Sequence, residues 1–474
     1  MPGTSISSHL MAQPDFARPL VVVSNRGPFT FKRNSDGALV PKRGGGGLIP
    51  SLAPAVADSG ATWISTAATE EDRQAAAAGP IEADGFRLRH VVLEPSVYRQ
   101  YYDVIANGTL WFLHHNLFDL ARRPFIDERW WGAWQRYCEV NFAFAKTVDE
   151  EAPEGATVLI HDYHLTLLGK WLRKRRPDLK TMHFHHTPFA SRNSIDVLPL
   201  PVVQAVLEGL AGHDVCGFNA QRWADSFALG CADHLGYAPR SFVSAAAPDA
   251  PELLAVAESP DSRASQKGLD ELASGRKLIV RVDRIELSKN IVRGFRAYDH
   301  LLRRYPQWRG KVTFAAFMYP SRQSLPEYLA YRNEVESTVA LINEEWATPD
   351  WQPIVLSLKD DFPHSVAGLV NYDVLLVNPI RDGLNLVAKE GAILNRRKGV
   401  VVLSREAGTW PELSNAAIGI NPFDIVGTSD ALVHALTMSD EERVARSEHL
   451  KQVSMARTPH DWLADQLRAV DEAR

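Results

Sequence analysis

The sequence predicts an α/β protein built from two doubly wound domains that face each other across a cleft. Short apolar runs alternate with longer stretches of helical periodicity along most of the chain. This alternation is typical of parallel sheets joined by crossover helices. The chain has 474 residues and is 45% hydrophobic. A chain of this length exceeds what one hydrophobic core usually serves, so two domains are expected.

The predicted strands are the short apolar runs. They are residues 20–23, 157–160, 181–184, 278–282, 312–317, 354–358, 374–377 and 399–403. The composition shifts between Ala245 and Ser274, a stretch rich in Ala, Pro, Ser and acidic residues, and we place the connection between the domains there. The predicted domains are therefore residues 1–250 and 251–455.

Composition and charge favour a small ligand in a reducing, cytoplasmic setting. The net charge of −5 offers no broad attraction to nucleic acid or to an anionic membrane. The first eighteen residues lack a signal-peptide pattern, and no apolar run is long enough to span a bilayer. Cys138, Cys216 and Cys231 have no metal-ligand spacing. The sequence leaves a homo-oligomer open.

The segment Val377–Glu390 combines a strand end, a glycine turn and a helix start. Asp382-Gly383 reads as the turn, and residues 386–394 have the apolar spacing of a helix that begins near Asn385. The free amides at that helix start favour an anion such as a diphosphate, and Glu390 is near enough to reach a ribose diol. The alternative is an ordinary strand-turn-helix corner with a capping Asp.

Other predicted strand ends also carry polar side chains. Arg284 and Lys289 are expected on one loop before a helix at residues 291–302, where two cations are unfavourable unless an anion lies between them. Arg322 is a further cation after a strand, and the glycine run of residues 44–47 is a weak candidate for close approach to a phosphate. Two histidine clusters, residues 161–165 and 185–189, lack helical ligand spacing, so a metal site is the less favoured interpretation.

In order along the chain, these segments resemble the trehalose-6-phosphate synthases, which are retaining glycosyltransferases. The matching motifs are VVVSNR at Val21–Arg26, GGL at Gly46–Leu48, YYDVIANGTLW at Tyr101–Trp111, HDYHL at His161–Leu165, HHTPF at His185–Phe189, LEGLAGHDVCGF at Leu207–Phe218, VDRIELSKN at Val282–Asn290, PSR at Pro320–Arg322, RDGLNLVAKE at Arg381–Glu390 and INPFD at Ile420–Asp424. The resemblance implies two facing Rossmann-like domains of the GT-B architecture. It also implies that residues 456–474 pack back on the first domain.

The resemblance also implies roles for individual residues. Arg284 and Lys289 would hold the nucleotide diphosphate and stabilise the charge on the leaving group. His186 would lie beside the reacting carbon, and Asp162 near the attacking hydroxyl. The implied donor-binding residues are Gly47, Asp382, Gly383, Asn385, Leu386, Val387 and Glu390, and the implied acceptor-binding residues are Arg26, Tyr102, Trp111 and Arg322. From the residues alone, core packing is the better interpretation of Tyr102 and Trp111.

The implied reaction moves glucose from GDP-glucose or UDP-glucose, with a slight preference for GDP-glucose, to glucose 6-phosphate and forms α,α-trehalose 6-phosphate. We find no convincing pair of carboxylates for a double displacement. The resemblance instead implies a front-face substitution in which the leaving phosphate accepts the acceptor's proton. Neither a cofactor nor a metal ion is expected.

Departures from the family pattern keep other functions open. Trp63–Thr66 replaces a W-x-G-W run, Ser191–Asn193 replaces Pro-x-Glu, and Asn290 replaces a Gly after Lys289. Several of these changes resemble pseudo-glycosyltransferases that join a GDP-linked cyclitol to an aminocyclitol phosphate. A catalytically silent sugar-phosphate sensor is a second alternative, although such a protein would be expected to lose its leaving-group cations first. A nicotinamide oxidoreductase is disfavoured because the first strand is not followed by G-x-G-x-x-G.

Overall fold

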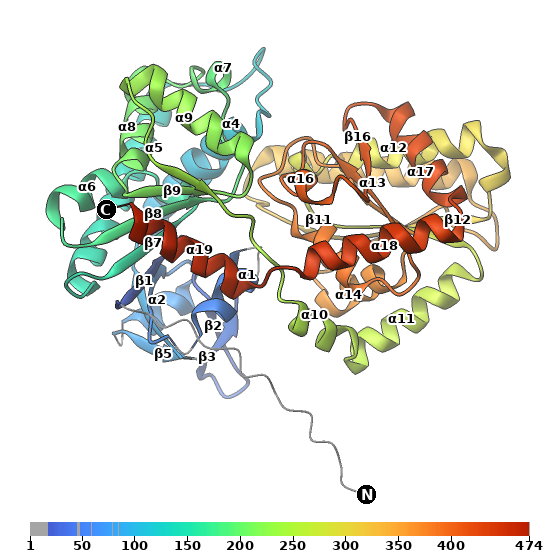
Figure 1. Cartoon of the computed structure of the whole chain (residues 1–474), viewed down its shortest axis with the longest axis horizontal. Coiled ribbons are helices and arrows are strands. Elements are labelled where there is room, and N and C mark those ends of the chain that lie inside the picture. Colours follow the sequence, from blue (N-terminus) through green and yellow to red (C-terminus); the bar gives the residue numbers. More distant parts are fainter. Residues whose placement is uncertain (1–17, 45–47, 58, 78, 84, 474) are drawn as a thin grey trace, which may run out of the picture.

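The protein forms two lobes that lie side by side (Figure 1). The computed structural model describes residues 18–44, 48–57, 59–77, 79–83 and 85–473. Each lobe is built on its own large sheet, and among the described residues no strand belongs to both sheets. The architecture is therefore the predicted pair of α/β domains.

The first sheet has the strand order β10-β9-β8-β7-β1-β4-β6-β5 and is parallel except where β5 pairs with β6. Its strands are β1 (Leu20–Val23), β4 (Thr62–Thr66), β5 (Ile81–Ala83), β6 (Phe86–Val91), β7 (Thr157–His161), β8 (Lys180–His185), β9 (Val215–Phe218) and β10 (Ser241–Val243). A separate hairpin joins β2 (Phe29–Arg33) and β3 (Leu39–Arg43). The helical elements of this domain are α1 (Leu48–Val56), α2 (Glu70–Ala76), α3 (Pro95–Arg99), the π-helix η1 (Gln100–Trp111), α4 (Phe112–His115), α5 (Glu128–Glu151), the 3-10 turn η2 (Tyr163–Leu165), α6 (Leu168–Arg175), α7 (Arg192–Ile195), α8 (Leu200–Ala211) and α9 (Gln221–Leu235).

The second sheet is entirely parallel, with the order β13-β12-β11-β14-β15-β16. Its strands are β11 (Lys277–Ile285), β12 (Val312–Pro320), β13 (Ile354–Ser357), β14 (Val374–Val377), β15 (Val400–Ser404) and β16 (Ile418–Ile420). The helical elements that follow β10 are α10 (Ala250–Ala257), α11 (Pro260–Ala273), η3 (Leu287–Lys289), α12 (Ile291–Arg304), η4 (Pro306–Trp308), α13 (Pro326–Trp346), α14 (Phe362–Asn371), α15 (Leu386–Leu394), α16 (Trp410–Leu413), α17 (Ile425–Thr437), α18 (Asp440–Met455) and α19 (Pro459–Glu472).

Every predicted strand is present, but β2, β3, β4, β5, β6, β9, β10 and β16 were not among the predictions. β4 shows why, because all five of its residues are buried although three of them are Thr or Ser. A search for apolar runs misses a central strand of this kind. The stretch from Ala245 to Ser274, predicted as the connection, instead contains α10 and α11, which pack against α14 through buried Leu253 and Leu269. The chain therefore crosses between the domains over a few residues before α10.

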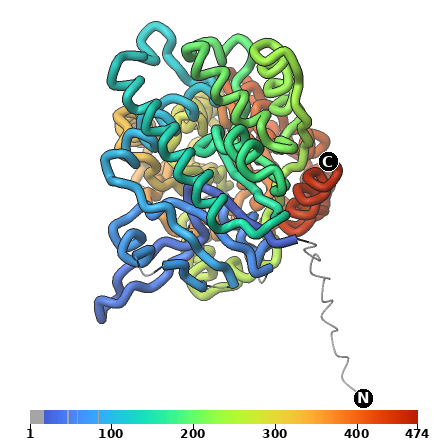
Figure 2. Tube along the Cα trace, turned by 90° about the vertical axis from the view of Figure 1, so that its left-hand side faces the viewer, coloured from blue at the N-terminus to red at the C-terminus, as the bar shows by residue number. Residues whose placement is uncertain are grey.

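The last helix returns to the first domain. α19 contacts β8, β9 and α1, whereas α18 packs on α15 of the second domain. In Figures 1 and 2 the red C-terminal helix lies against the first domain. Trp462 is fully buried, and its ring centroid is 5.1 Å from that of Phe184 on β8. These contacts support domain boundaries near residues 250 and 455, which stay a prediction.

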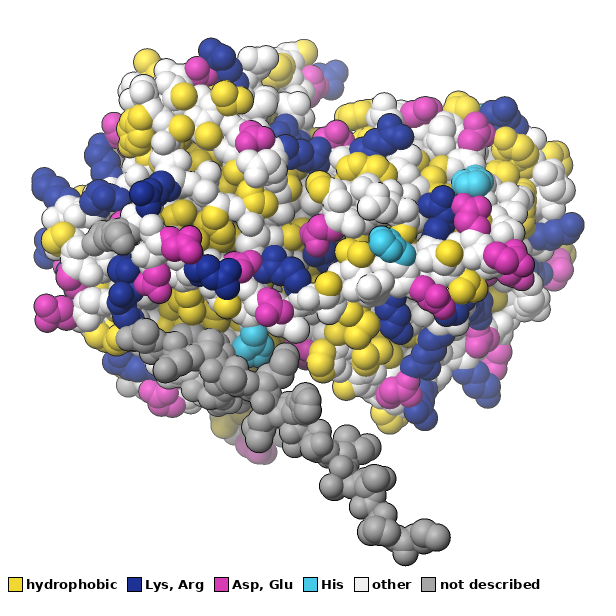
Figure 3. Space-filling view, in the orientation of Figure 1, with side chains coloured by type: hydrophobic (Ala, Val, Ile, Leu, Met, Phe, Trp, Pro, Cys, Tyr) yellow, Lys and Arg dark blue, Asp and Glu magenta, His cyan; other side chains and the backbone are white. Residues whose placement is uncertain are grey.

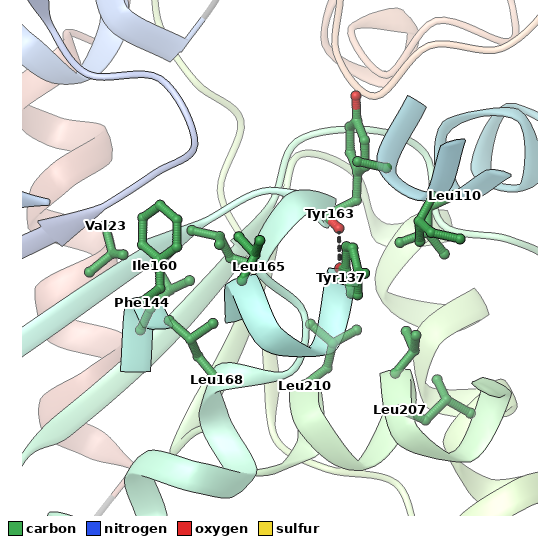
Figure 4. Packing of buried hydrophobic residues seen from close by; sticks show 14 of the residues in the cluster. Val23, Leu110, Tyr137, Phe144, Ile160, Tyr163, Leu165, Leu168, Leu207 and Leu210 are labelled. Carbon is green, nitrogen blue, oxygen red and sulfur yellow. Dashed lines mark hydrogen bonds between the residues drawn. The ribbon is translucent and has the colours of Figure 1, made fainter. Parts of the chain in front are cut away.

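The core of the first domain anchors the loop after β7. Figure 4 shows Tyr137 of α5 against Tyr163, with the Tyr137 hydroxyl donating a hydrogen bond of 2.7 Å to the Tyr163 carbonyl. Leu165 and Leu168 are fully buried beside them. These core contacts fix the short 3-10 element η2 and, with it, the position of Asp162, the polar residue just before it.

The surface carries both signs of charge. On the face shown in Figure 3, Lys and Arg side chains are interspersed with Asp and Glu. Among the described residues, no helix is both long and apolar enough to cross a lipid bilayer.

Candidate active site

The predicted site residues follow the carboxyl ends of strands in both sheets. They follow or end β1 (Arg26), β7 (Asp162), β8 (His186), β11 (Arg284), β12 (Arg322) and β14 (Asp382). In a parallel sheet these ends form one edge, which is where α/β folds bind ligands. The two edges meet, because Arg322 donates to the hydroxyl of Tyr163 at 3.2 Å, and the indole of Trp223 donates to the Gly383 carbonyl at 3.0 Å.

Lys289 and Asp382 form an ion pair at the carboxyl end of the second sheet. Lys289 Nζ donates to Asp382 Oδ2 at 2.7 Å, and Asn385 Nδ2 donates to the same oxygen at 3.1 Å. Burial would lower the pKa of Lys289, but the carboxylates of Asp382 and Asp283 outweigh it and raise that pKa. Burial would raise the pKa of Asp382, but Lys289 lowers it. Both side chains are therefore charged at neutral pH.

Arg284 lies within β11, which corrects the prediction that it shares a loop with Lys289. The strand continues through Ile285 because its pairing with β12 places Arg284 opposite Tyr319. Only Lys289 lies in the following turn, η3. The two cations also have carboxylate partners, Glu286 for Arg284 and Asp382 for Lys289. The unfavourable cation pair that predicted an anion is thus partly compensated within the protein.

The helix predicted after the glycine turn has the expected bounds. α15 begins at Leu386, with Val387 in its first turn, and ends at Leu394. Asn385 precedes it with φ 78°, and the helix start has no side-chain cap. The first-turn amides are therefore oriented as donors for an anion. Burial raises the pKa of Glu390 to about 7, so this carboxyl can donate or accept a hydrogen bond near neutral pH.

Asp162 and His186 come from neighbouring strands of the first sheet. Asp162 has φ 75° and ψ 165°, a strained conformation for a residue with a side chain, and accepts from the Tyr163 amide at 3.0 Å. Burial raises the pKa of Asp162 to about 6 and lowers that of His186 to about 3. His186 is therefore neutral, and its Nε2 lies 3.1 Å from Nδ1 of His161.

Gly383 lies directly against the backbone of the first domain. A Cβ at this position would be 1.8 Å from the His186 carbonyl oxygen. No side chain fits there without separating the two edges. The glycine of the predicted turn is therefore required by the contact between the domains.

A π-helix brings the two predicted aromatic residues of the acceptor site to one side. Tyr102 and Trp111 are nine positions apart, and at 3.6 residues per turn an α-helix would place them on opposite faces. The wider i→i+5 turn of η1 makes nine residues roughly two turns, so they share a face. Arg26 Nη2 donates to the Tyr102 hydroxyl at 3.1 Å, and the Arg322 guanidinium lies 5.1 Å from the Trp111 ring.

Arg322 has more partners than any other predicted site residue. Its Nη1 donates to the Tyr328 hydroxyl at 2.5 Å and to Glu286 Oε1 at 3.2 Å, and its φ is 43°. Burial would raise the pKa of Tyr102, but Arg26 and Arg322 outweigh it and lower that pKa. Arg26 thus contacts Tyr102, Arg322 contacts Trp111, and both cations act electrostatically on the Tyr102 hydroxyl.

Several residues of the site were not predicted from the sequence. Glu286 and Arg281 are buried, and Arg281 donates to Asp283 at 2.8 Å and to the Lys289 carbonyl at 2.9 Å, which fixes the η3 turn. A signal was present in the sequence, because Arg281 is two positions from Asp283 and Arg284 is two positions from Glu286. Residues two positions apart project to the same side of an extended strand, so each Arg can pair with its acidic neighbour. Tyr163, Tyr328 and Trp223 gave no comparable signal.

Gly47 lies outside the described residues, so the predicted contact of its backbone with the donor stays a prediction. Gly44 is described, and its amide donates to the Pro28 carbonyl at 2.7 Å. Within the described part of the chain, no group of three or more His, Cys, Asp or Glu side chains is arranged to hold a metal ion.

Comparison with known protein families gives a match over nearly the whole chain. The family model described as Glycosyltransferase family 20 matches residues 18–472. This chain belongs to glycosyltransferase family 20. Members in Mycolicibacterium vanbaalenii and in a Mycobacterium species, strain JLS, both named trehalose-6-phosphate synthase, are 33% and 32% identical. The first alignment covers 95% of each chain, and the second covers 96% of each chain.

Solved structures with similar sequences superpose over both domains. The E. coli protein bound with UDP-2-fluoro glucose is 27% identical and superposes with a TM-score of 0.84, covering 96% of this chain and 99% of that one. The synthase from Burkholderia xenovorans in complex with glucose-6-phosphate is 26% identical, with a TM-score of 0.83 over 96% of this chain and 100% of that one. The family 20 chain described here is thus a glycosyltransferase of GT-B architecture, similar to trehalose-6-phosphate synthases.

Proposed function

We propose that this protein is a retaining glucosyltransferase that transfers glucose from GDP-glucose or UDP-glucose to glucose 6-phosphate and forms α,α-trehalose 6-phosphate. One observation carries the proposal. A cationic site suited to a diphosphate lies on the second domain, and a second cationic site suited to a sugar phosphate lies where Arg322 of that domain meets the first domain at Trp111. Glu286 contacts a cation of each site, Arg284 and Arg322. The relatives bound with a UDP-glucose analogue and with glucose-6-phosphate support the assignment of the two substrates.

The donor is proposed to bind at the second domain. The diphosphate would take the first-turn amides of α15 at Leu386 and Val387, together with Arg284 and Lys289. Since Lys289 remains charged, it can stabilise the negative charge that develops on the leaving phosphate. Asp382 and Gly383 would bind the glucose, and Glu390 the ribose.

The acceptor is proposed to bind between the domains, against the first domain and Arg322 of the second. Arg26, Tyr102, Trp111 and Arg322 would hold its phosphate, because two guanidiniums and a phenol of lowered pKa supply donors for an anion. Asp162 would accept a hydrogen bond from the sugar near the attacking hydroxyl.

The proposed chemistry is a front-face substitution. The bond between C1 of glucose and the phosphate oxygen breaks, a bond from C1 to the acceptor oxygen forms on the same face, and the leaving phosphate takes the acceptor's proton. His186, which is neutral, would orient the donor sugar without acting as an acid. Orientation and electrostatic stabilisation would supply the rate, and no residue here is asked to form a covalent intermediate.

The test is nucleotide release from UDP-glucose, GDP-glucose and ADP-glucose, each with and without glucose 6-phosphate, with the sugar product identified. The proposal expects release that depends on the acceptor, together with trehalose 6-phosphate. Unphosphorylated glucose is the matched control and should be a poor acceptor. Binding of the nucleotide sugar without any transfer, or transfer to glucose as fast as to its phosphate, would contradict the proposal.

A further inference from the structure

The carboxylate of Glu286 lies at the junction of the two anion-binding groups. Glu286 follows β11 directly and is 2% exposed. Its Oε1 accepts from Ser321 Oγ at 3.0 Å and from Arg322 Nη1 at 3.2 Å, and Arg284 Nη1 lies 3.1 Å from the same oxygen. A single oxygen atom thus contacts one cation from each group.

The charge balance around this oxygen is tight. Burial would raise the pKa of Glu286, but Arg284 and Arg322 outweigh it and lower that pKa to about 2. Arg322 also acts on Arg284 as a like charge. Two guanidiniums this close repel each other unless an anion lies between them. Glu286 supplies that anion from within the chain, so the distance between the guanidiniums depends on its carboxylate.

The two cations differ in how firmly the rest of the protein holds them. Arg322 has Tyr163 and Tyr328 as further partners, and its side chain is 10% exposed. Arg284 is 36% exposed, and Glu286 is the ion-pair partner found for it among the described residues. Loss of the carboxylate should therefore displace Arg284 more than Arg322.

We propose that Glu286 is a positioning residue that couples the donor and acceptor sites by holding Arg284 and Arg322 on one carboxylate oxygen. This inference rests on the proposed function, because it takes Arg284 as a ligand of the donor diphosphate and Arg322 as a ligand of the acceptor phosphate. Glu286 itself need touch neither substrate. By setting the separation of the two cations, it sets the distance between the leaving group and the acceptor sugar, to which the rate is sensitive.

The geometry disfavours a nucleophilic role for the same residue. A nucleophilic carboxylate needs an oxygen free to reach the sugar carbon. The carboxylate of Glu286 is 2% exposed and is held through Oε1 by Ser321, Arg284 and Arg322, so it could approach a sugar carbon only by leaving both cations. The carboxylate is therefore held as a fixed counter-charge.

The kinetic test compares two substitutions at this position. Glu286→Gln keeps the shape and one accepting oxygen but removes the charge, and Glu286→Asp keeps the charge on a shorter side chain. In E286Q we expect kcat to fall at least tenfold, while KM for both substrates stays within about threefold, because both cations remain. E286D should recover part of kcat. Glu336→Gln is the matched control, since Glu336 pairs with Arg332 at 2.7 Å on α13.

Three results would overturn the inference. The first is an unchanged kcat in E286Q. The second is a rise in acceptor KM at constant kcat, which a simple phosphate ligand would give. The third is recovery of kcat in E286Q on addition of azide, while E286D stays as slow as E286Q. That pattern would identify Glu286 as a nucleophile.

A crystal structure of E286Q provides a readout that needs no turnover. The Arg284 guanidinium should move away from Arg322, whereas an unmoved pair would contradict the positioning role. If the wild-type protein transfers no glucose but the guanidiniums separate in E286Q, the proposed function fails and the positioning role stands. If Gln at this position prevents folding, E286D serves for both measurements, with a smaller fall in kcat and a smaller displacement expected.

Discussion

Replacement of Lys289 by Ala should slow transfer far more than it weakens substrate binding. Two unit charges about 4 Å apart attract by roughly 4 kcal/mol at an effective dielectric of about 20. If about half of the attraction between Lys289 and the diphosphate develops only as the leaving group gains charge, the barrier rises by about 2 kcal/mol, or roughly 30-fold in rate. Removal of a preorganised donor to a developing anion typically costs about 10² to 10³ in kcat. We therefore expect kcat to fall about 30- to 1,000-fold.

The assay combines steady-state transfer with calorimetric binding of the free nucleoside diphosphate. The Kd should rise by about tenfold or less, because Arg284 and the α15 amides remain. Lys277→Ala is the matched control: Lys277 pairs with Asp373 at 2.9 Å at the start of β11, the strand that ends just before the turn of Lys289, and its loss should leave kcat unchanged. A K289A enzyme within threefold of wild-type kcat, or one whose Kd rises as much as kcat falls, would refute the reasoning.

Three further predictions concern the acceptor site, the pH dependence and the contact between the domains. Arg322→Lys keeps the charge but loses the planar fork, so KM for glucose 6-phosphate should rise roughly tenfold with little change in donor binding. Since the pKa of Asp162 is raised to about 6, its carboxylate forms as pH rises through that value, and kcat/KM for the acceptor should fall below it. Trp223→Phe removes the donor to the Gly383 carbonyl, at a cost of about 1–3 kcal/mol, so kcat/KM for the donor should fall about tenfold or more. The first two are read from steady-state kinetics, and the third also from a larger radius of gyration in X-ray scattering.

A contradicting outcome can be stated for each of the three variants, and Trp223→Phe also has a matched control. Equal KM values for glucose 6-phosphate in the wild type and in Arg322→Lys would contradict the role of Arg322 in binding the acceptor phosphate. The Asp162→Asn enzyme should transfer glucose slowly, and its kcat/KM for the acceptor should fall at low pH only through protonation of the substrate phosphate. If the pH profile of this variant matches that of the wild type, Asp162 does not cause the acidic fall. Trp351→Phe is matched to Trp223→Phe, because the Trp351 indole donates to the Val312 carbonyl at 3.0 Å within the second domain. If both Phe variants behave alike, the interdomain bond does not matter for transfer.

Local sequence determined much of the fold and several parts of the site. The run Val374–Val377 and the helix Leu386–Leu394 were predicted with the bounds that the structure shows. Short-range physics decides such segments, because apolar periodicity and turn residues act within a few positions. Central strands with Thr and Ser, such as β4, were missed, since their burial comes from neighbours distant in the sequence.

The sequence by itself determined which residues stand at strand ends and therefore which side chains can meet a ligand. Only the tertiary structure decided how they meet. The π-helical turn that brings Tyr102 and Trp111 to one face, and the extension of β11 that takes Arg284 off the loop, depend on packing and strand pairing. The shared contact of Glu286 with Arg284 and Arg322 depends on the registration of β11 against β12. Electrostatic balance is a property of distances in space, and residues far apart in a sequence acquire those distances only when the domains fold and meet.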